Sequence, residues 1–400
     1  MAELYSLPDG WEWKKLGDLA KFQSGGTPSR SNKTYWDNGN IPWVKISDIT
    51  DEMYVTNTEE FITKAGLDNS SAKLFPKNTI LYTIFATIGK IGILDIEATT
   101  NQAISGIQPK NNVDLFYMYY GLKFITNEVQ KVSTGVAQNN INLTKLKEQW
   151  FPLPPLEEQK RIVAKLDNLF AKIDKAIDLH QKNIDEADIF MESVLNDVFV
   201  ELNGVYQKRQ LDSFDKKMSS GGTPSRKEKL YWDNGTIDWF SSGELNQLYT
   251  LPSKEKITQL GLEKTSTKLF SKGTLLIGMY DTAAMKMSIL SNDGSCNQAI
   301  VGFKSDESEL NILFLKYQLE YLKKDILEQR QGVRQQNLNL SKIKNIEIEY
   351  PPLKTQQKVV AYLDEISNKM EKIKQIQKEK MQSLKALKAS ILDKAFKGEL

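Results

Sequence analysis

The sequence has few of the side chains from which common catalytic and metal sites are built. It contains one cysteine, Cys296, and one histidine, His180, in 400 residues. A single cysteine allows no disulfide within the chain and no site with several thiolate ligands. The histidine falls in the middle of a long helical pattern, so no Ser-His or Cys-His nucleophile pair is expected, and we interpret it as a polar residue of a helix interface.

Several motifs and segments are also missing. There is no Gly-x-x-x-x-Gly-Lys-Ser/Thr phosphate loop, no Gly-x-Gly-x-x-Gly fingerprint and no Asn/Asp-Pro-Pro-Tyr/Phe methyltransferase motif. No apolar run approaches 18 residues, and the first residues lack the basic and apolar pattern of a secretion signal. We therefore expect a cytoplasmic, non-catalytic protein with no membrane partner, although acidic nuclease sites are poorly marked in one sequence.

Charge is nearly balanced over the whole chain but not along it. The net charge is +2, from 53 Lys and Arg against 51 Asp and Glu. Residues 151–205 hold 6 basic and 11 acidic side chains (net −5), whereas residues 348–400 hold 11 and 7 (net +4). Residues 1–150 have a net charge of −1 and residues 206–347 of +4. The two segments of opposite charge are better matched to each other than to themselves.

These two segments have the periodicity of long helices. Each begins at a Pro-Pro-Leu motif, where proline is tolerated, and contains no later proline before the helical pattern ends. The expected buried positions are Ile162, Leu166, Leu169, Ile173, Ile177, Ile184, Ala187, Met191, Val194 and Val198, then Gln356, Val359, Leu363, Ile366, Met370, Ile373, Met381, Leu384, Leu387 and Ile391. His180 and Gln377 occupy matching polar positions. We predict an intramolecular antiparallel coiled coil.

The segments before the helices are copies of each other. Residues 220–239 are identical to residues 24–43 at 15 of 20 positions, in Ser-Gly-Gly-Thr-Pro-Ser-Arg and Tyr-Trp-Asp-Asn-Gly. The copies continue through expected buried strands (79–84 and 274–279) and amphipathic helices (117–132 and 312–327). We predict an α+β fold with two pseudo-twofold-related mixed α/β domains, residues 1–150 and 206–347, separated by the long helices of residues 151–205 and 348–400.

The duplicated loops contain the residue types that contact phosphates and bases. Glycines let backbone N–H groups approach an oxyanion, hydroxyl and basic side chains donate to phosphates, and Gln, Asn and Arg can recognise base edges. The candidate residues are Gly25, Gly26, Thr27, Ser29, Arg30, Lys33, Tyr35, Gln138, Asn139, Gly221, Gly222, Thr223, Ser225, Arg226, Lys229, Tyr231, Arg334, Gln335 and Gln336. A purely structural turn is the alternative for these loops. The neighbouring Trp36, Trp43, Trp232 and Trp239 fit a core better than base stacking.

Taken together, these motifs resemble the specificity subunit of type I restriction-modification enzymes. The resemblance rests on the opening 7–18, the Ser-Gly-Gly-Thr-Pro-Ser loops, the Pro-Pro-Leu-x-x-Gln helix starts and the closing 395–400, and it covers the whole chain. It implies a non-catalytic subunit whose two target recognition domains each read half of a bipartite double-stranded DNA target, while the helices set the spacer. It also implies two modification subunits and restriction subunits as partners, with S-adenosylmethionine, ATP and Mg²⁺ on those partners and no cofactor on this chain.

Two other functions stay open. A scaffold that joins two protein-binding globules would fail to bind any duplex, even with the modification subunits. A fused enzyme would modify or cut DNA alone. Within the DNA hypothesis the copies differ at Ala137 against Arg334 and at Lys45 against Ser241, so we expect different half-sites and a shared phosphate grip.

Overall fold

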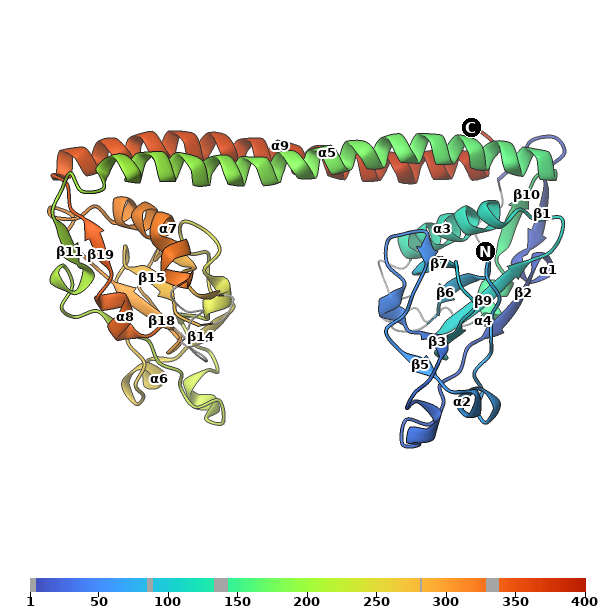
Figure 1. Cartoon of the computed structure of the whole chain (residues 1–400), viewed down its shortest axis with the longest axis horizontal. Coiled ribbons are helices and arrows are strands. Elements are labelled where there is room, and N and C mark those ends of the chain that lie inside the picture. Colours follow the sequence, from blue (N-terminus) through green and yellow to red (C-terminus); the bar gives the residue numbers. More distant parts are fainter. Residues whose placement is uncertain (1–4, 85–88, 133–142, 281–282, 329–337) are drawn as a thin grey trace. The chain divides into compact units, whose positions relative to one another are not determined.

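The computed structural model describes residues 5–84, 89–132, 143–280, 283–328 and 338–400. The chain divides into two compact units: unit 1 contains Met1–Gln181 and Lys378–Leu400, and unit 2 contains Lys182–Gln377. Within each unit a mixed α/β globule packs against a pair of long helices (Figure 1). These helices, α5 (Leu156–Leu202) and α9 (Leu353–Lys397), each contribute to both units. The α+β class and the two long helices are thus confirmed.

Unit 1 contains three sheets and four short or medium helices before α5. The sheets have the strand orders β2-β9-β6-β7-β4, β5-β3-β8 and β1-β10. The strands are β1 (Glu12–Lys15), β2 (Ala20–Ser24), β3 (Ile41–Val44), β4 (Tyr54–Val55), β5 (Phe61–Ile62), β6 (Ile80–Thr83), β7 (Ile91–Leu94), β8 (Thr99–Thr100), β9 (Ile104–Pro109) and β10 (Trp150–Leu153). The helices are α1 (Leu16–Leu19), α2 (Lys64–Asp68), α3 (Leu115–Val132) and α4 (Leu143–Lys147).

Unit 2 repeats this design. Its sheets have the orders β12-β18-β15-β16, β14-β13-β17 and β11-β19. The strands are β11 (Lys208–Gln210), β12 (Ser219–Ser220), β13 (Ile237–Phe240), β14 (Glu255–Ile257), β15 (Leu275–Gly278), β16 (Met287–Ile289), β17 (Gly294–Cys296), β18 (Ile300–Phe303) and β19 (Glu347–Glu349). The helices are α6 (Gln259–Glu263), α7 (Ile312–Glu328) and α8 (Leu340–Lys344). In both units the first strand pairs antiparallel with the last, which leads into a long helix.

The local predictions hold where the sequence pattern was strong. The two buried apolar runs form the fully buried strands β6 and β15, and the two amphipathic segments form α3 and α7. The short strand expected at residues 41–44 is β3. It pairs antiparallel with β5 and parallel with β8, and β13 repeats both pairings in unit 2.

The long helices pair antiparallel within each unit. In unit 1 Arg161 donates to the backbone carbonyl of Leu400, and farther along Lys388 Nζ lies 2.7 Å from Asp174 Oδ1. In unit 2 Lys374 Nζ lies 2.8 Å from Asp188 Oδ1. In both ion pairs α9 supplies the lysine and α5 the carboxylate, as the opposite net charges of the two segments predict.

The predicted buried stripe of α9 is wrong at two positions. Ile373 and Leu387 are 39% and 47% exposed, while the side chains of Lys374 and Lys388 are only 17% and 30% exposed. The reason is the heptad phase. Positions 374, 381, 388 and 395 follow one another at seven-residue intervals, as an unbroken seam requires, whereas 373 and 387 each fall one residue short. The two lysines cover the seam with their aliphatic stems and reach α5 carboxylates with their ammonium groups.

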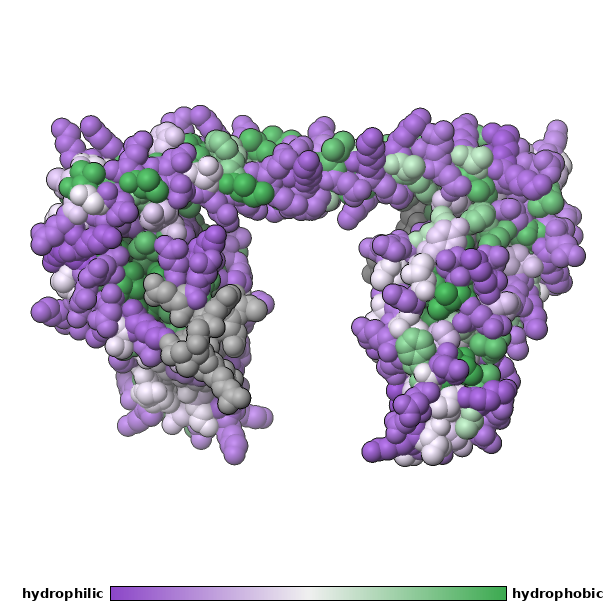
Figure 2. Space-filling model, in the orientation of Figure 1, coloured by the Kyte–Doolittle hydropathy of each residue, from purple (hydrophilic) through white to green (hydrophobic). Residues whose placement is uncertain are grey.

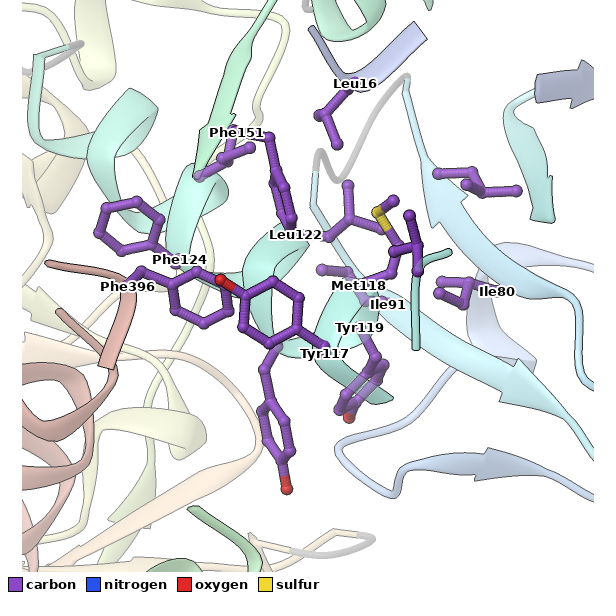
Figure 3. Packing of buried hydrophobic residues seen from close by; sticks show 14 of the residues in the cluster. Leu16, Ile80, Ile91, Tyr117, Met118, Tyr119, Leu122, Phe124, Phe151 and Phe396 are labelled. Carbon is purple, nitrogen blue, oxygen red and sulfur yellow. The ribbon is translucent and has the colours of Figure 1, made fainter. Parts of the chain in front are cut away.

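An aromatic cluster joins α3 to the end of α9 in unit 1. Figure 3 shows Phe124 and Phe396 face to face, with Tyr117 and Phe151 beside them. The Phe124 and Phe396 rings are stacked at 5.3 Å with an angle of 9°, and Phe396 is fully buried. Burying a phenylalanine side chain contributes about 1.5–3 kcal/mol. This cluster therefore holds the last turns of the chain on the first globule.

Unit 2 forms the matching cluster with a different segment. Phe199, at the end of α5, stacks on Tyr321 of α7 at 5.4 Å. Tyr120 donates to Asp167 in unit 1 at 2.5 Å, and Tyr317 donates to Asp364 in unit 2 at 2.6 Å. The two units are therefore equivalent at the level of single contacts.

A buried glutamine fixes each globule on its helix. Gln159, which is fully buried, donates to the carbonyls of Asn112 and Pro154 at 3.1 and 2.9 Å and accepts from the N–H of Asp114 at 2.8 Å. One amide thus joins the start of α3, the preceding loop and the start of α5. Gln356 makes the same three hydrogen bonds in unit 2, to Glu309, Pro351 and Asn311.

Candidate functional site

The paired glycines of the duplicated loops are packed inside each globule. Gly25 and Gly26 are buried, and their N–H groups donate to the carbonyls of Ile104 and Thr100. A Cβ atom on Gly25 would lie 2.0 Å from Thr100 Oγ1 and one on Gly26 2.3 Å from Ser71 Oγ, so no larger residue fits. These N–H groups are used within the domain.

The second copy has the same arrangement. The N–H groups of Gly221 and Gly222 donate to the carbonyls of Ile300 and Cys296, and a Cβ on Gly221 would lie 2.1 Å from the Cys296 oxygen. The structure therefore shows a packing role for all four glycines. Contact between these loops and DNA stays a prediction, which depends on the side chains around them.

Each loop ends in an arginine that stacks on tryptophan and pairs with glutamate. The Arg30 guanidinium lies 3.7 Å from the Trp36 ring centre and 4.7 Å from that of Trp43, and its Nη1 lies 2.5 Å from Glu60 Oε2. The Arg30 side chain is still 53% exposed. Hydrogen bonding to Arg30, supported by Lys45, lowers the pKa of Glu60. Arg30 is therefore held in one geometry at the surface.

The second arginine repeats this cluster. The Arg226 guanidinium lies 3.9 Å from the Trp232 ring centre and 5.0 Å from that of Trp239, and its Nη2 donates to Glu255 at 2.8 Å. Hydrogen bonding to Arg226 lowers the pKa of Glu255. An arginine already engaged on two sides is a framework residue with free edges rather than a fully available phosphate clamp.

The tryptophans form part of the globule cores, as expected. Trp43 and Trp239 are each 3% exposed, and their indole N–H groups donate to the carbonyls of Gly26 and Gly222. Trp36 meets Trp43 edge to face at 5.1 Å, and Trp232 meets Trp239 in the same way. Such rings are not free to stack on bases.

The remaining candidates differ in exposure. Ser29, Lys33, Ser225 and Lys229 are exposed. Tyr35 and Tyr231 are partly buried, and their carbonyls accept from the N–H groups of the residues that cap α2 and α6. In Figure 1 this region lies at the end of each unit farthest from the long helices. The exposed serines and lysines are the candidates with free side chains at that end.

Sequence reasoning missed one partner in each loop. Thr27 donates to the side-chain carbonyl of Gln102, and Thr223 donates to that of Gln298 at 2.5 Å. Both glutamines belong to the repeated Asn-Gln-Ala-Ile motif, whose duplication was the available signal. The polar group of each loop therefore extends to the turn before β9 or β18.

The two copies differ beside this shared framework. Lys45 lies 2.7 Å from Glu59 and 3.2 Å from Glu60, and these hydrogen bonds raise its pKa. At the matching position Ser241 donates to Glu244 at 2.7 Å. The predicted contacts at Gln138, Asn139, Arg334, Gln335 and Gln336, and the comparison of Ala137 with Arg334, lie outside the described residues.

Among the described residues, no group of three or more His, Cys, Asp or Glu side chains is placed to hold a metal ion. In that same part of the chain, no helix is both long and apolar enough to cross a lipid bilayer. The geometry described here is thus that of two rigid surfaces, each with arginine, lysine and hydroxyl groups at its tip.

Comparison with known proteins finds one family along most of the chain. A family model described as the type I restriction modification DNA specificity domain matches residues 8–186 and again residues 204–380. The MjaIX type I restriction enzyme specificity subunit of Methanocaldococcus jannaschii is 28% identical over 427 residues, covering 100% of this chain and 95% of that protein. The EcoR124I/EcoR124II specificity subunit of Escherichia coli is 33% identical over 172 residues, 41% of this chain and 42% of that protein.

A solved structure shares the fold. It comes from work described as the structural basis of complex assembly and conformational transition of the type I R-M system. The TM-score is 0.73 at 22% identity, over 99% of this chain and 100% of that one.

Proposed function

This chain belongs to the type I restriction-modification DNA specificity family, as a specificity subunit with two copies of the family's domain, and we propose that each copy reads one half of a bipartite duplex target. In this proposal the chain carries no catalytic site. Modification subunits supply adenine methylation with S-adenosylmethionine, and restriction subunits supply cleavage with ATP and Mg²⁺.

One observation carries the proposal. The same framework of two packed glycines, an arginine stacked on two tryptophans and a paired glutamate occurs in both units, whereas the side chains next to it differ, as with Lys45 and Ser241. A constant framework with variable neighbours suits two surfaces that grip the same phosphate backbone but recognise different bases.

The long helices offer surface for the partner subunits. Ile189, Phe190, Tyr362 and Ile376 are 64%, 50%, 52% and 43% exposed in unit 2. Figure 2 shows hydrophobic residues among the hydrophilic ones along the helices. Exposed large apolar side chains on otherwise charged helices are typical of protein contact sites. We propose that two modification subunits dock here and that the helices set the spacer between the half-sites.

A domain replacement tests the reading of two half-sites. Strands β1 and β10 bound the first globule and β11 and β19 the second, and each last strand leads into a Pro-Pro-Leu helix start. Residues 12–153 can therefore be replaced by a second copy of residues 208–349. The wild-type and hybrid chains would each be expressed with the neighbouring modification subunit, and methyladenine motifs read by single-molecule sequencing.

The wild type should give two different short blocks with a fixed gap. The hybrid should give the second block twice, in opposite orientations. A hybrid motif identical to the wild-type motif would contradict the proposal, as would the absence of any wild-type motif with a modification subunit that is active with another specificity subunit.

A further inference from the structure

Unit 1 contains a cavity of about 350 Å³ between α3, α5 and α9. Its lining combines Lys123 and Thr126 of α3, Phe170 of α5, and Lys385 and Lys388 of α9, with Gly89 at one edge. The space is large enough for a phosphate group and several water molecules, since each water occupies roughly 30 Å³. None of the residues from which the candidate site was built lines it.

The three lysines make this cavity strongly basic. Lys388 pairs with Asp174 at 2.7 Å and lies 4.8 Å from the Phe170 ring centre. Lys123 lies 4.5 Å from the Tyr119 ring centre. Within the described part of the chain, neither Lys123 nor Lys385 has a carboxylate within ion-pair distance. Two lysines without a paired carboxylate therefore face the same cavity as a third.

The equivalent place in unit 2 shows that this charge is not needed for folding. The matched contacts of Tyr120 with Asp167 and of Tyr317 with Asp364 align Lys123 with Glu320. The matched Phe396 and Phe199 align Lys385 and Lys388 with Asp188 and Met191. A cavity of about 640 Å³ is present there, and its charged lining residues are Glu192, Glu320, Asp325, Lys323 and Lys324.

We propose that the cavity of unit 1 is a phosphate-binding site that holds a backbone phosphate of the bound DNA through Lys123, Lys385 and Lys388. The assignment of DNA as the source rests on the proposed function; a free phosphate is the other source of the same chemistry. A like-charged group of lysines on an apolar floor is unfavourable alone, and an oxyanion between them removes that repulsion. Unit 2, with acidic residues at the matching positions, has no such site.

The site makes anion affinity depend on pH in one direction. Burial, assisted by the charge of Lys388, lowers the pKa of Lys123 to about 8, while Asp51 and Asp174 act in the opposite sense. Lys385 also faces this cavity. An anion stabilises charged Lys123 and raises its pKa. Affinity is therefore constant below pH 8, where Lys123 is already protonated, and falls at higher pH because binding then requires proton uptake.

Two double variants of the full chain, assembled with its modification subunits, test the site. The first is Lys123→Gln with Lys385→Gln, which leaves the Lys388–Asp174 pair intact. The control is Lys165→Gln with Lys172→Gln, which removes the same charge from exposed positions of α5 in unit 1. Affinity is measured from 0.05 to 0.3 M salt for duplexes with and without the methylated target, and calorimetry with inorganic phosphate is run without DNA.

The cavity variant should bind both duplexes roughly 10- to 30-fold more weakly at 0.15 M salt, with the log–log salt slope reduced by about 1.8, while the preference for the target is unchanged. It should also lose the decline in affinity above pH 8. The control should match the wild type.

Unchanged DNA binding together with loss of wild-type phosphate binding would keep the site and assign it to free phosphate. If the cavity variant equals the control in both assays, the site is overturned. Target methylation by the wild type, scored separately, shows whether the proposed function itself stands.

Discussion

At the scale of single residues, Arg30 and Arg226 show how a side chain of DNA-binding type can serve the fold first. Each guanidinium is stacked on a tryptophan and paired with a glutamate. Arg30→Ala removes an exposed cation–π contact of about 0.5–1 kcal/mol and an exposed ion pair of up to about 1 kcal/mol. We expect a loss of about 1–2 kcal/mol in the free energy of unfolding, measured in urea, and the same loss for Arg226→Ala.

The pH dependence of that loss identifies the ion pair. Because Arg30 lowers the pKa of Glu60, the pair stabilises the fold above the unfolded pKa of glutamate, about 4.3, and this part is lost as the pH falls through the lowered pKa. The difference between wild type and Arg30→Ala should therefore be larger at pH 7 than at pH 3. Lys33→Ala, at an exposed neighbour, is the control. Arg30→Ala would argue against a framework role if it left stability unchanged and altered only DNA affinity.

The single cysteine reports on the integrity of unit 2. Cys296 is fully buried in β17, and burial raises the pKa of its thiol to about 12. Because the thiolate is the reactive form, labelling of the native chain by a thiol reagent at pH 8 should be on the order of 10³-fold slower than that of the unfolded chain. Comparing reaction rates with and without urea measures this. Rapid labelling of the native chain would show that β17 is accessible.

At the scale of elements, the buried glutamines are the strongest local determinants of how globule and helix meet. Gln159→Leu would leave two carbonyls and one N–H of unit 1 without their partners, each at a cost of about 1–3 kcal/mol when solvent cannot reach it. We expect a loss of about 2–4 kcal/mol. Gln356→Leu should cause the same loss in unit 2.

Cysteine labelling separates these two variants. Gln356→Leu should accelerate labelling of Cys296, which lies in the same unit, more than Gln159→Leu does. Equal acceleration by both variants would show that the two units open together, and no effect of either on urea unfolding would contradict the structural role of the amides.

Elements were predictable where the evidence was periodic and local. Helices α3, α5, α7 and α9 follow from apolar spacing, and β6 and β15 from continuous apolar runs. The outward turn of Ile373 and Leu387 was not recognised, because a heptad tolerates lysine when its stem packs and its charge reaches a carboxylate on another helix. Side-chain hydrophobicity alone therefore gave the wrong phase at these positions.

The candidate site was less predictable for a related reason. The pattern Gly-Gly-Thr-Pro-Ser-Arg indicates glycine flexibility and basic charge, but the partners of these residues are Thr100, Ser71 and Glu60, which are 30 or more residues away. No local pattern identifies those contacts. The same applies to the lysine cavity, whose members come from α3, α5 and α9 and are separated by more than 200 residues.

At the scale of the whole molecule, duplication has kept the framework and released the surfaces. Paired contacts such as Tyr120 with Asp167 and Tyr317 with Asp364 repeat with little change. The cavity residue Lys123 and its counterpart Glu320, in contrast, have opposite charges. Selection on folding acts on the shared contacts, while each unit's surface is free to suit its own ligand.

The proposed spacing role of the helices gives a whole-molecule prediction. Seven residues inserted after Gln181 in α5 and seven after Gln377 in α9, both at the boundary between the units, preserve the heptad phase of each helix. Each insertion adds about 10.5 Å of helix, the length of about three base pairs. We expect the methylated motif to keep both blocks and to gain about three unspecified base pairs, or recognition to be lost if the added DNA twist cannot be matched. An insertion in α5 alone, which shifts its lysine and carboxylate partners on α9 out of register, should abolish methylation. A motif with its original gap after the paired insertion would show that something other than the helices sets the spacer.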